Sequence, residues 1–193
     1  DDLLVLPGAT FVLGDTDEEA RERAAVVRRQ QVSRGTALVF AEQLWNRDLS
    51  AYDADGPIPD VEPDEGPITI APGSIPARSF AGRRHAVVAD LRERAAAHGW
   101  TLRDAMIETR ARHSFVGSPQ TVAAEIDRHV QEGACDGFIL VPHITPGGLD
   151  EFVDRVVPLL QERGVLRAGY EGATLRENLG LAGDRVGSVP GGA

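Results

Sequence analysis

The chain has 193 residues, of which 42% are hydrophobic and 26% are charged, and this composition suits one globular domain of ordinary size. Thirty acidic residues against twenty basic ones give a net charge of −10. This balance argues against binding to nucleic acid or to an anionic membrane surface, because both need positive potential. One cysteine, Cys135, excludes internal disulfides and multi-cysteine metal sites, so we expect a cytoplasmic protein without a metal.

All twenty basic residues are arginines, because the chain contains no lysine. It therefore cannot form a lysine Schiff base, hold pyridoxal phosphate through a lysine, or build a Walker-type phosphate loop. No apolar run approaches the roughly eighteen residues that a membrane-spanning helix needs. The chain begins at Asp1 without a secretory leader, which is consistent with a piece of a longer protein.

The N-terminal part predicts one strand and two helices. Residues 3–6 form a continuous apolar run, which predicts a strand buried on both faces, and residues 10–13 extend it after a break. Thr16, three residues before a glutamate, forms a capping box and predicts a helix over residues 16–31. A second helix is predicted over residues 36–45, with its apolar face in the core.

The segment that follows differs in composition. Residues 46–77 contain six prolines, and six acidic residues without a basic one lie between Asp53 and Pro67. Proline at this density prevents regular helix, and like charges extend the chain. We interpret residues 46–77 as a surface insertion within one domain of residues 1–182. A lid over a pocket and a domain boundary are the alternatives. The Gly-rich residues 183–193 are expected to form a flexible tail.

The second half alternates helices with strands. Strands are predicted over residues 113–116 and 138–141, and their close spacing predicts a βαβ unit with a parallel sheet. Helices are predicted over four further ranges, of which the last is bent at Pro158: residues 79–99, 101–107, 119–133 and 149–163.

The sequence lacks the usual catalytic signatures, so no catalytic residue and no metal ligand is predicted. Glu125 and His129 are four residues apart on a predicted helix, and without a third ligand we interpret them as a solvated ion pair. His113 precedes a strand, at the end opposite to the one where parallel barrels carry out chemistry. We interpret His113 as a structural residue.

Residues that follow strands are better placed for a ligand. In parallel α/β folds, ligands bind beyond the carboxyl ends of the strands. We expect these ends at Pro7-Gly8, Val116-Gly117 and Pro142-His143, and His143 is the one titratable group among them. Pro142, His143 and Thr145 are therefore the candidate substrate-pocket residues. The alternative is a loop histidine in contact with solvent.

Three ordered stretches and a closing motif carry a family resemblance. The stretches are Val5-Leu6-Pro7-Gly8 with the helix start behind it, Phe115-Val116-Gly117-Ser118-Pro119, and Gly137-Phe138-Ile139-Leu140 with Pro146-Gly147-Gly148-Leu149. They resemble the sixth, seventh and eighth βα units of bacterial luciferase-like flavin monooxygenases. The closing Tyr170-Glu171-Gly172 and Thr174-Leu175-Arg176 are similar to the subgroup that contains nitrilotriacetate monooxygenase component A, the pristinamycin synthase large subunit and dibenzothiophene-sulfone monooxygenase.

The resemblance implies an α/β fold, namely about the last three βα units of a (βα)8 TIM barrel with a long Pro/Asp-rich insertion. It also implies a two-component monooxygenase that takes reduced FMN from a separate NAD(P)H-dependent flavin reductase and uses O2 to oxygenate a small organic substrate. The FMN contacts of that family lie mainly in earlier strands. No cofactor-binding residue is therefore predicted here, and we expect the chain to be inactive alone.

Other interpretations stay open. One is a non-catalytic α/β interaction module or a decayed remnant of the same family, and another is a deazaflavin-dependent relative of the barrel. The reading frame upstream of Asp1 distinguishes the monooxygenase from the non-catalytic module. Five further βα units with a serine-rich turn after the fifth would favour the enzyme, and a start codon near Asp1 would favour the module. The sequence does not predict the substrate, and it is consistent with a homo-oligomer.

Overall fold

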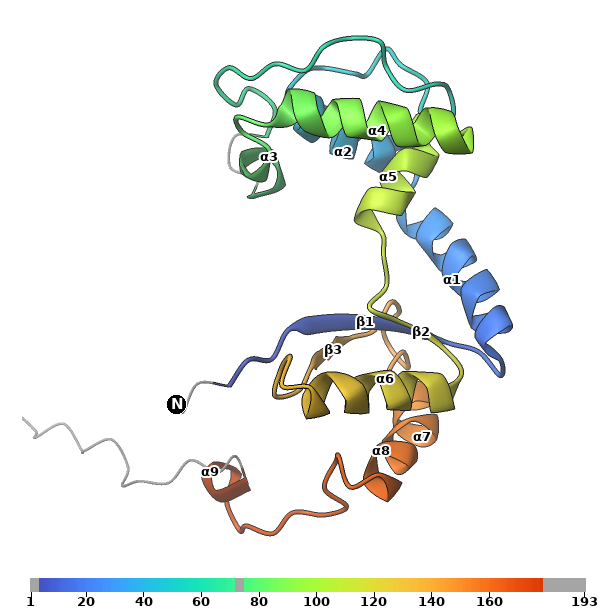
Figure 1. Cartoon of the computed structure of the whole chain (residues 1–193), viewed down its shortest axis with the longest axis vertical. Helices are drawn as coiled ribbons and strands as arrows, with labels where there is room; N and C mark the ends of the chain where they lie inside the picture. The colour runs from blue at the N-terminus through green and yellow to red at the C-terminus, as the bar shows by residue number, and fades with distance from the viewer. Residues whose placement is uncertain (1–3, 72–74, 179–193) are drawn as a thin grey trace, which may run out of the picture.

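The computed structural model describes residues 4–71 and 75–178 (Figure 1). A helical unit, made of α2 to α5, lies apart from a sheet unit, made of β1 to β3 with α6 to α8, and α1 and the segment after α5 connect the two. The elements in chain order are β1 (Gly8–Leu13), α1 (Asp17–Gln31), α2 (Arg34–Trp45), α3 (Ile75–Ser79), α4 (Arg84–His98), α5 (Leu102–Arg110), β2 (Phe115–Gly117), α6 (Pro119–Gln131), β3 (Ile139–Val141), α7 (Asp150–Arg155), α8 (Val157–Glu162) and α9 (Leu175–Asn178).

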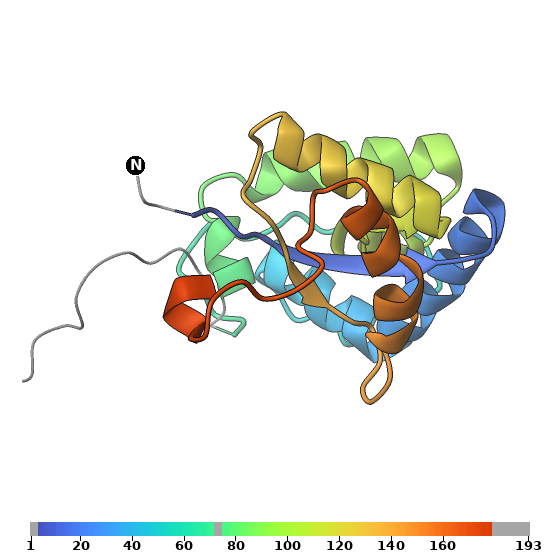
Figure 2. The same cartoon turned by 90° about the horizontal axis from the view of Figure 1, so that it is seen from below.

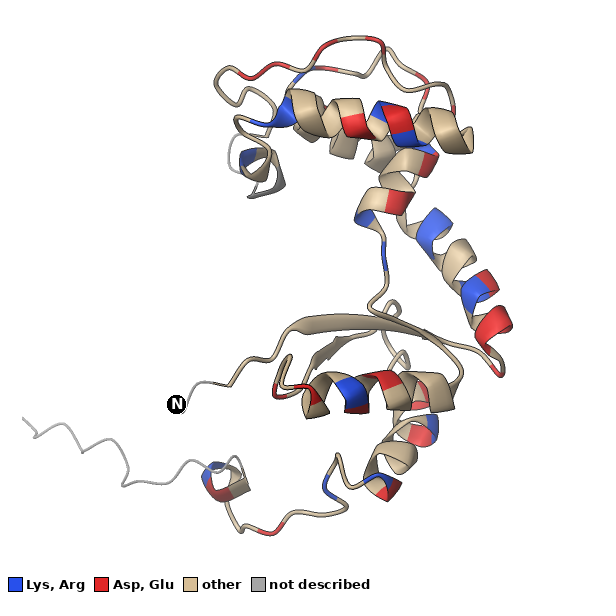
Figure 3. Cartoon of the chain, viewed as in Figure 1, with Lys and Arg blue, Asp and Glu red and all other residues tan. Residues whose placement is uncertain are grey.

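The three strands form one parallel sheet in the order β2-β1-β3, so the predicted parallel sheet is confirmed. The second half of β1 pairs with β2, where Leu13 lies opposite Gly117. The first half of β1 pairs with β3, where Thr10 lies opposite Val141. The strands carry no charged residue, whereas the surrounding helices and the loop above α4 carry many (Figure 3).

The strand order differs from that of consecutive barrel strands. In a (βα)8 barrel each strand pairs with the next one along the chain, and every helix lies on the outside. Here β1 separates β2 from β3. Phe11 packs against Phe152 of α7, with ring centroids 4.8 Å apart, whereas Val116 lines a cavity together with residues of α1. Helices α6, α7 and α8 thus lie on one face of the sheet, whereas α1 starts near the end of β1 and leads away to the helical unit (Figures 1 and 2).

The first strand begins later than predicted. The expected buried strand over residues 3–6 is wrong for its described part, because Leu4, Val5 and Leu6 are 57%, 52% and 45% exposed and the strand starts at Gly8. Residue 3 lies outside the described residues. Backbone bonds to the segment before β3 hold this stretch, but nothing in the described chain covers its apolar side chains.

Local capping accounts for the helix boundaries. The Thr16 side chain accepts from the Glu19 backbone N–H at the start of α1, and Ser118 caps α6 in the same way ahead of a proline. Most of the predicted helices are confirmed to within a few residues at each end. The range 149–163 is two short helices, α7 and α8, which meet at Val156 because Pro158 has no backbone N–H to continue the first.

The helical unit has its own apolar core. Trp45 is fully buried at its centre, and its indole Nε1–H donates to the Val61 carbonyl at 2.8 Å. Leu49 and Ala54, which lie inside the predicted 46–77 segment, are also buried in this core, and α3 begins at Ile75. The other buried members of the core are Val32, at the end of α1, and residues of α2, α4 and α5: Ala37, Ala41, Leu44, Val88, Leu91, Leu102, Ala105, Met106 and Ile107.

Two predictions concern the ends of the chain and its relation to membranes. The expected flexible tail, residues 183–193, lies outside the described residues, as does the predicted domain limit at 182. Across residues 4–71 and 75–178, none of the helices combines the length and apolar character needed to cross a bilayer.

Candidate functional site

The register of the sheet decides which strand ends lie together. β1 and β2 end at the same level, because Leu13 pairs with Gly117, whereas β3 ends opposite Thr10 in the middle of β1. The predicted carboxyl end at Pro7-Gly8 is wrong, since Gly8 is the first residue of β1. The structure therefore brings together the ends of two strands, and it sets the end of the third apart.

The three predicted pocket residues share the loop between β3 and α7. Pro142 is half-buried, and His143 and Thr145 are exposed. The loop is tightly folded, because a side chain at Gly148 would collide with the Ile144 carbonyl oxygen and approach Pro142 Cβ to 2.7 Å. These residues are therefore close in space, and their role as a substrate pocket stays a prediction.

Asp17 lies close to the point where β1 and β2 end side by side. Its Oδ1 accepts a hydrogen bond from the Ser118 backbone N–H at 2.7 Å, which joins the start of α1 to the start of α6. This hydrogen bond, aided by the hydroxyls of Thr121 and Ser118, lowers the pKa of Asp17 below its usual 3.8. A side chain at Gly117 would lie 3.0 Å from Asp17 Oδ1. No local sequence pattern indicates this contact, because 101 positions separate the partners.

His113 lies just before β2, as predicted, and its side chain is half-buried. It lines a cavity of about 430 Å³ with Arg21, Arg28, Arg112, Glu108 and Val116, which we call the arginine cavity. Burial lowers the pKa of His113 below 6.5, and the positive charges of His143 and Arg28 lower it further. The structure thus brings the predicted residue His143 within electrostatic range of His113, from the far side of β1.

The Glu125 and His129 pair is different from the prediction. His129 Nδ1 contacts the Glu125 backbone oxygen at 2.7 Å, and no ion pair joins the two side chains. The His129 ring packs edge-on against Phe115 and Phe138, with centroids about 6 Å from each. The interpretation as a solvated ion pair is therefore wrong. Within the described ranges, no group of three or more acidic, histidine or cysteine side chains is arranged to hold a metal.

We expect the depressed pKa of His113 to make the protein less stable in mild acid. The unfolded chain binds a proton at higher pH than the folded one, so stability falls as pH drops through about 6.5. Replacing His113 with Asn should reduce the fall in thermal midpoint between about pH 7.5 and about pH 5.5. Parallel midpoint curves for the two proteins over this range would contradict the assignment.

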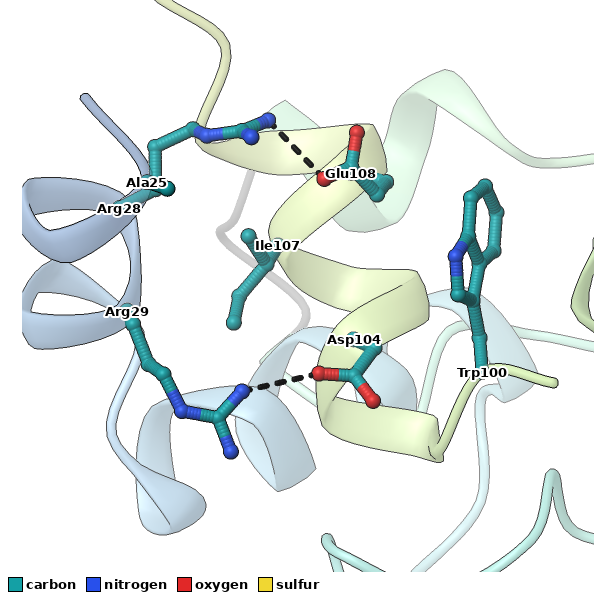
Figure 4. A pocket seen from close by; sticks show the side chains of 7 residues that line it. All are labelled: Ala25, Arg28, Arg29, Trp100, Asp104, Ile107 and Glu108. Atoms are coloured by element: carbon teal, nitrogen blue, oxygen red, sulfur yellow. Dashed lines mark hydrogen bonds and ion pairs between the residues drawn. The ribbon is translucent and has the colours of Figure 1, made fainter. Parts of the chain in front are cut away.

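Ion pairs join α1 to the helical unit (Figure 4). Arg28 of α1 reaches Glu108 of α5 and Arg29 reaches Asp104, each at 3.0 Å, beside a small cavity near Trp100. Ion pairs that stay in contact with solvent, as these do, contribute on the order of 0–1 kcal/mol each. They fix the direction of α1 and with it one wall of the arginine cavity.

Comparisons with known proteins identify the wider family, although no family model matches the chain. N-acetyl-S-(2-succino)cysteine monooxygenase of Bacillus subtilis (strain 168) is 34% identical over 182 residues, which are 93% of this chain and 38% of that protein. Nitrilotriacetate monooxygenase component A of Aminobacter aminovorans is 31% identical over 186 residues, 94% of this chain and 37% of its own length. The chain belongs to the luciferase-like flavin monooxygenase family.

A solved structure supports the same relationship. The riboflavin lyase RcaE, whose structure was determined with modified FMN and riboflavin, superposes with a TM-score of 0.54 at 30% identity over 90% of this chain and 34% of the lyase. The chain thus spans less than two fifths of each of these luciferase-like relatives. The predicted family is confirmed, and the match extends over nearly the whole chain.

The described residues do not by themselves fit FMN. At the level ends of β1 and β2 the Asp17 carboxylate is negative, and it already occupies the Ser118 N–H that could otherwise bind a phosphate. A flavin phosphate would meet charge repulsion at this edge of the sheet. No step of a flavin reaction is therefore assigned to residues of this chain.

Proposed function

We propose that this chain is the C-terminal portion of a two-component FMN-dependent monooxygenase. The complete enzyme would take reduced FMN from an NAD(P)H-dependent flavin reductase and use O2 to oxygenate a small organic substrate. The proposal rests on the family relationship and on the activities of the relatives, which are monooxygenases acting on small organic compounds. Pro142, His143 and Thr145 would contribute to the substrate pocket of that enzyme, and residues 46–77 would form an insertion between two of its βα units.

One structural observation carries the proposal that more chain is required. Ile139 and Val141 of β3 are 58% and 47% exposed, and they lie beside the exposed Leu4, Val5 and Leu6. Among the described strands, β2 and β3 each also have one edge that pairs with no other strand. Exposed apolar side chains next to unpaired edges mark an interaction surface. Additional βα units would pair with these edges and cover these side chains.

An apolar cavity of about 530 Å³ adds to this surface. It lies between α6, β3 and the two helices that follow β3, and the side chains around it include Phe138, Leu140, Leu149 and Val153. A further helix packed outside an added strand would fill such a space. The alternative, a module that acts through this apolar face without catalysis, uses the same surface for a separate protein.

The decisive experiment compares this chain with the longer polypeptide encoded by the same reading frame. With reduced FMN supplied by a flavin reductase, the longer polypeptide is expected to consume O2 and oxygenate substrate, and the 193-residue chain is not. Candidate substrates start with small organic carboxylates and organosulfur compounds, after the names of the relatives. A start codon next to Asp1, with no upstream βα units, would instead support the interaction module.

A further inference from the structure

The arginine cavity has a charge that is unusual for this protein. The chain has a net charge of −10, yet the cavity is lined by three arginines and one histidine against a single carboxylate, Glu108. It lies between α1, α5 and β2, and it extends toward the residues that precede β2. This position is distinct from the loop after β3 that contains the candidate substrate-pocket residues.

The carboxylate does not neutralise the cavity. Glu108 pairs with Arg28 at 3.0 Å, so one positive charge is matched. Arg112 donates from Nε to the Glu108 backbone oxygen and pairs with no carboxylate of the described chain. Arg21 likewise has no ion pair among the described residues. Arg112 and the imidazole therefore remain without a negative partner, and Arg21 interacts only at longer range with Asp17, whose pKa it lowers.

Buried polar atoms in the cavity also lack partners. Arg28 Nε and both ring nitrogens of His113 are buried and form no hydrogen bond within residues 4–71 and 75–178. A buried polar group without a hydrogen-bond partner is unfavourable. A ligand in the open part of the cavity does not reach these atoms, but its negative charge would relieve the repulsion between the arginines and His113.

We propose that the arginine cavity is a binding site for a small oxyanion. The volume of about 430 Å³ lies within the usual range for small-molecule sites, which is roughly 300–1,000 Å³. Planar guanidinium groups bind carboxylate and phosphate-like oxygens through paired N–H donors. The ligand that fits this site is thus compact and negatively charged. It is either a molecule with two or more carboxylates or a tetrahedral oxyanion. The site does not depend on the proposed monooxygenase activity.

Binding at this site should strengthen as the pH falls. The groups around His113 are Arg21 and Arg28 from α1, Glu108 from α5, Arg112 from its own segment, and His143 from beyond β3. These charges favour neutral imidazole in the empty cavity. A bound oxyanion favours the imidazolium, so proton uptake and anion uptake support each other.

The test is calorimetric titration of the full 193-residue chain with sulfate and, separately, with citrate, in bis-Tris or Tris chloride at low ionic strength. Sulfate represents tetrahedral oxyanions and keeps its charge between about pH 6 and about pH 8, and citrate represents carboxylates. The variants are Arg21→Gln and Arg112→Gln, whose parent side chains are exposed, and His113→Asn. Arg128→Gln, on the exposed surface of α6, removes one positive charge elsewhere and is the matched control.

We expect saturable binding of at least one probe, weakened about tenfold or more by Arg21→Gln or Arg112→Gln and unchanged by Arg128→Gln. Sulfate binding should be tighter at the lower pH, and His113→Asn should remove that difference. Preference for citrate or for sulfate identifies the class of acid group. The proposal is overturned if neither probe binds, or if Arg128→Gln weakens binding as much as the cavity variants do.

Discussion

Titration of FMN into the isolated 193-residue chain is expected to show no saturable change in flavin fluorescence in the micromolar range. The edge of the sheet where β1 and β2 end together presents the Asp17 carboxylate, and the backbone donor nearest to it is already used. A phosphate at that edge would be repelled rather than bound. The sheet also has only three strands, so no enclosed pocket surrounds an isoalloxazine ring within the described chain.

The comparison of FMN with riboflavin makes this experiment informative. Adsorption of the flavin ring to the exposed apolar side chains would be weak and equal for the two molecules, because riboflavin lacks only the phosphate. If FMN binds weakly, riboflavin does not bind, and sulfate displaces the FMN, then the FMN phosphate is bound in the arginine cavity. Saturable micromolar binding of FMN that Arg112→Gln leaves intact would show that the chain contains a complete flavin site, and our expectation would then be wrong.

Local features of the fold could be predicted well from the sequence. The starts of α1 and α6 follow from Thr16 and from Ser118 with Pro119, since a cap depends on residues three positions apart. The strand order could not be predicted in the same way. The spacing between β2 and β3 indicates a parallel pair, but β1 lies between them, and the choice of neighbour depends on packing among segments far apart in the chain.

The contacts between charged residues could not be predicted from the sequence either. Arg21, Arg28 and Arg112 look like ordinary surface arginines in an arginine-rich sequence, and only the packing of α1 against α5 brings them around His113. Asp17 looks like a favourable first-turn acid, yet its carboxylate bonds to Ser118. Pairings over about a hundred residues leave no trace in local spacing, so the candidate site could be predicted only in its loop residues.

Asn46 is expected to be the most sensitive polar residue of the helical unit. It ends α2 in the left-handed conformation with φ of 53°, and it is only 2% exposed. Its Oδ1 accepts from the backbone N–H of Thr69 at 2.9 Å and of Ile70 at 3.3 Å. Its Nδ2 donates to the backbone oxygens of Asp64 and Pro67. One side chain therefore joins the end of α2 to the acidic, proline-rich segment.

We expect Asn46→Gly to lower the free energy of unfolding of the helical unit by about 2–4 kcal/mol, because buried donors and acceptors lose their partners. Asn46→Ala should cost about 1–2 kcal/mol more, because alanine disfavours the left-handed conformation that glycine accepts. The measurement is urea denaturation followed by tryptophan fluorescence. Both tryptophans, Trp45 and Trp100, belong to the helical unit, so this signal reports its unfolding.

Comparing the stability losses of Asn46→Gly and Asn46→Ala distinguishes the contribution of the hydrogen bonds from that of the backbone conformation. Equal losses for Asn46→Gly and Asn46→Ala would mean that the positive φ contributes nothing. Ordinary surface substitutions change the free energy of unfolding by less than about 0.5 kcal/mol. If both variants lose less than this, the Asn46 side chain does not hold the segment. Asn46→Asp is the conservative comparison, since its carboxylate keeps the bonds to Thr69 and Ile70 but meets the carbonyls of Asp64 and Pro67 as a second acceptor. Its stability should fall between those of the parent and Asn46→Ala, because half of the hydrogen-bond set survives.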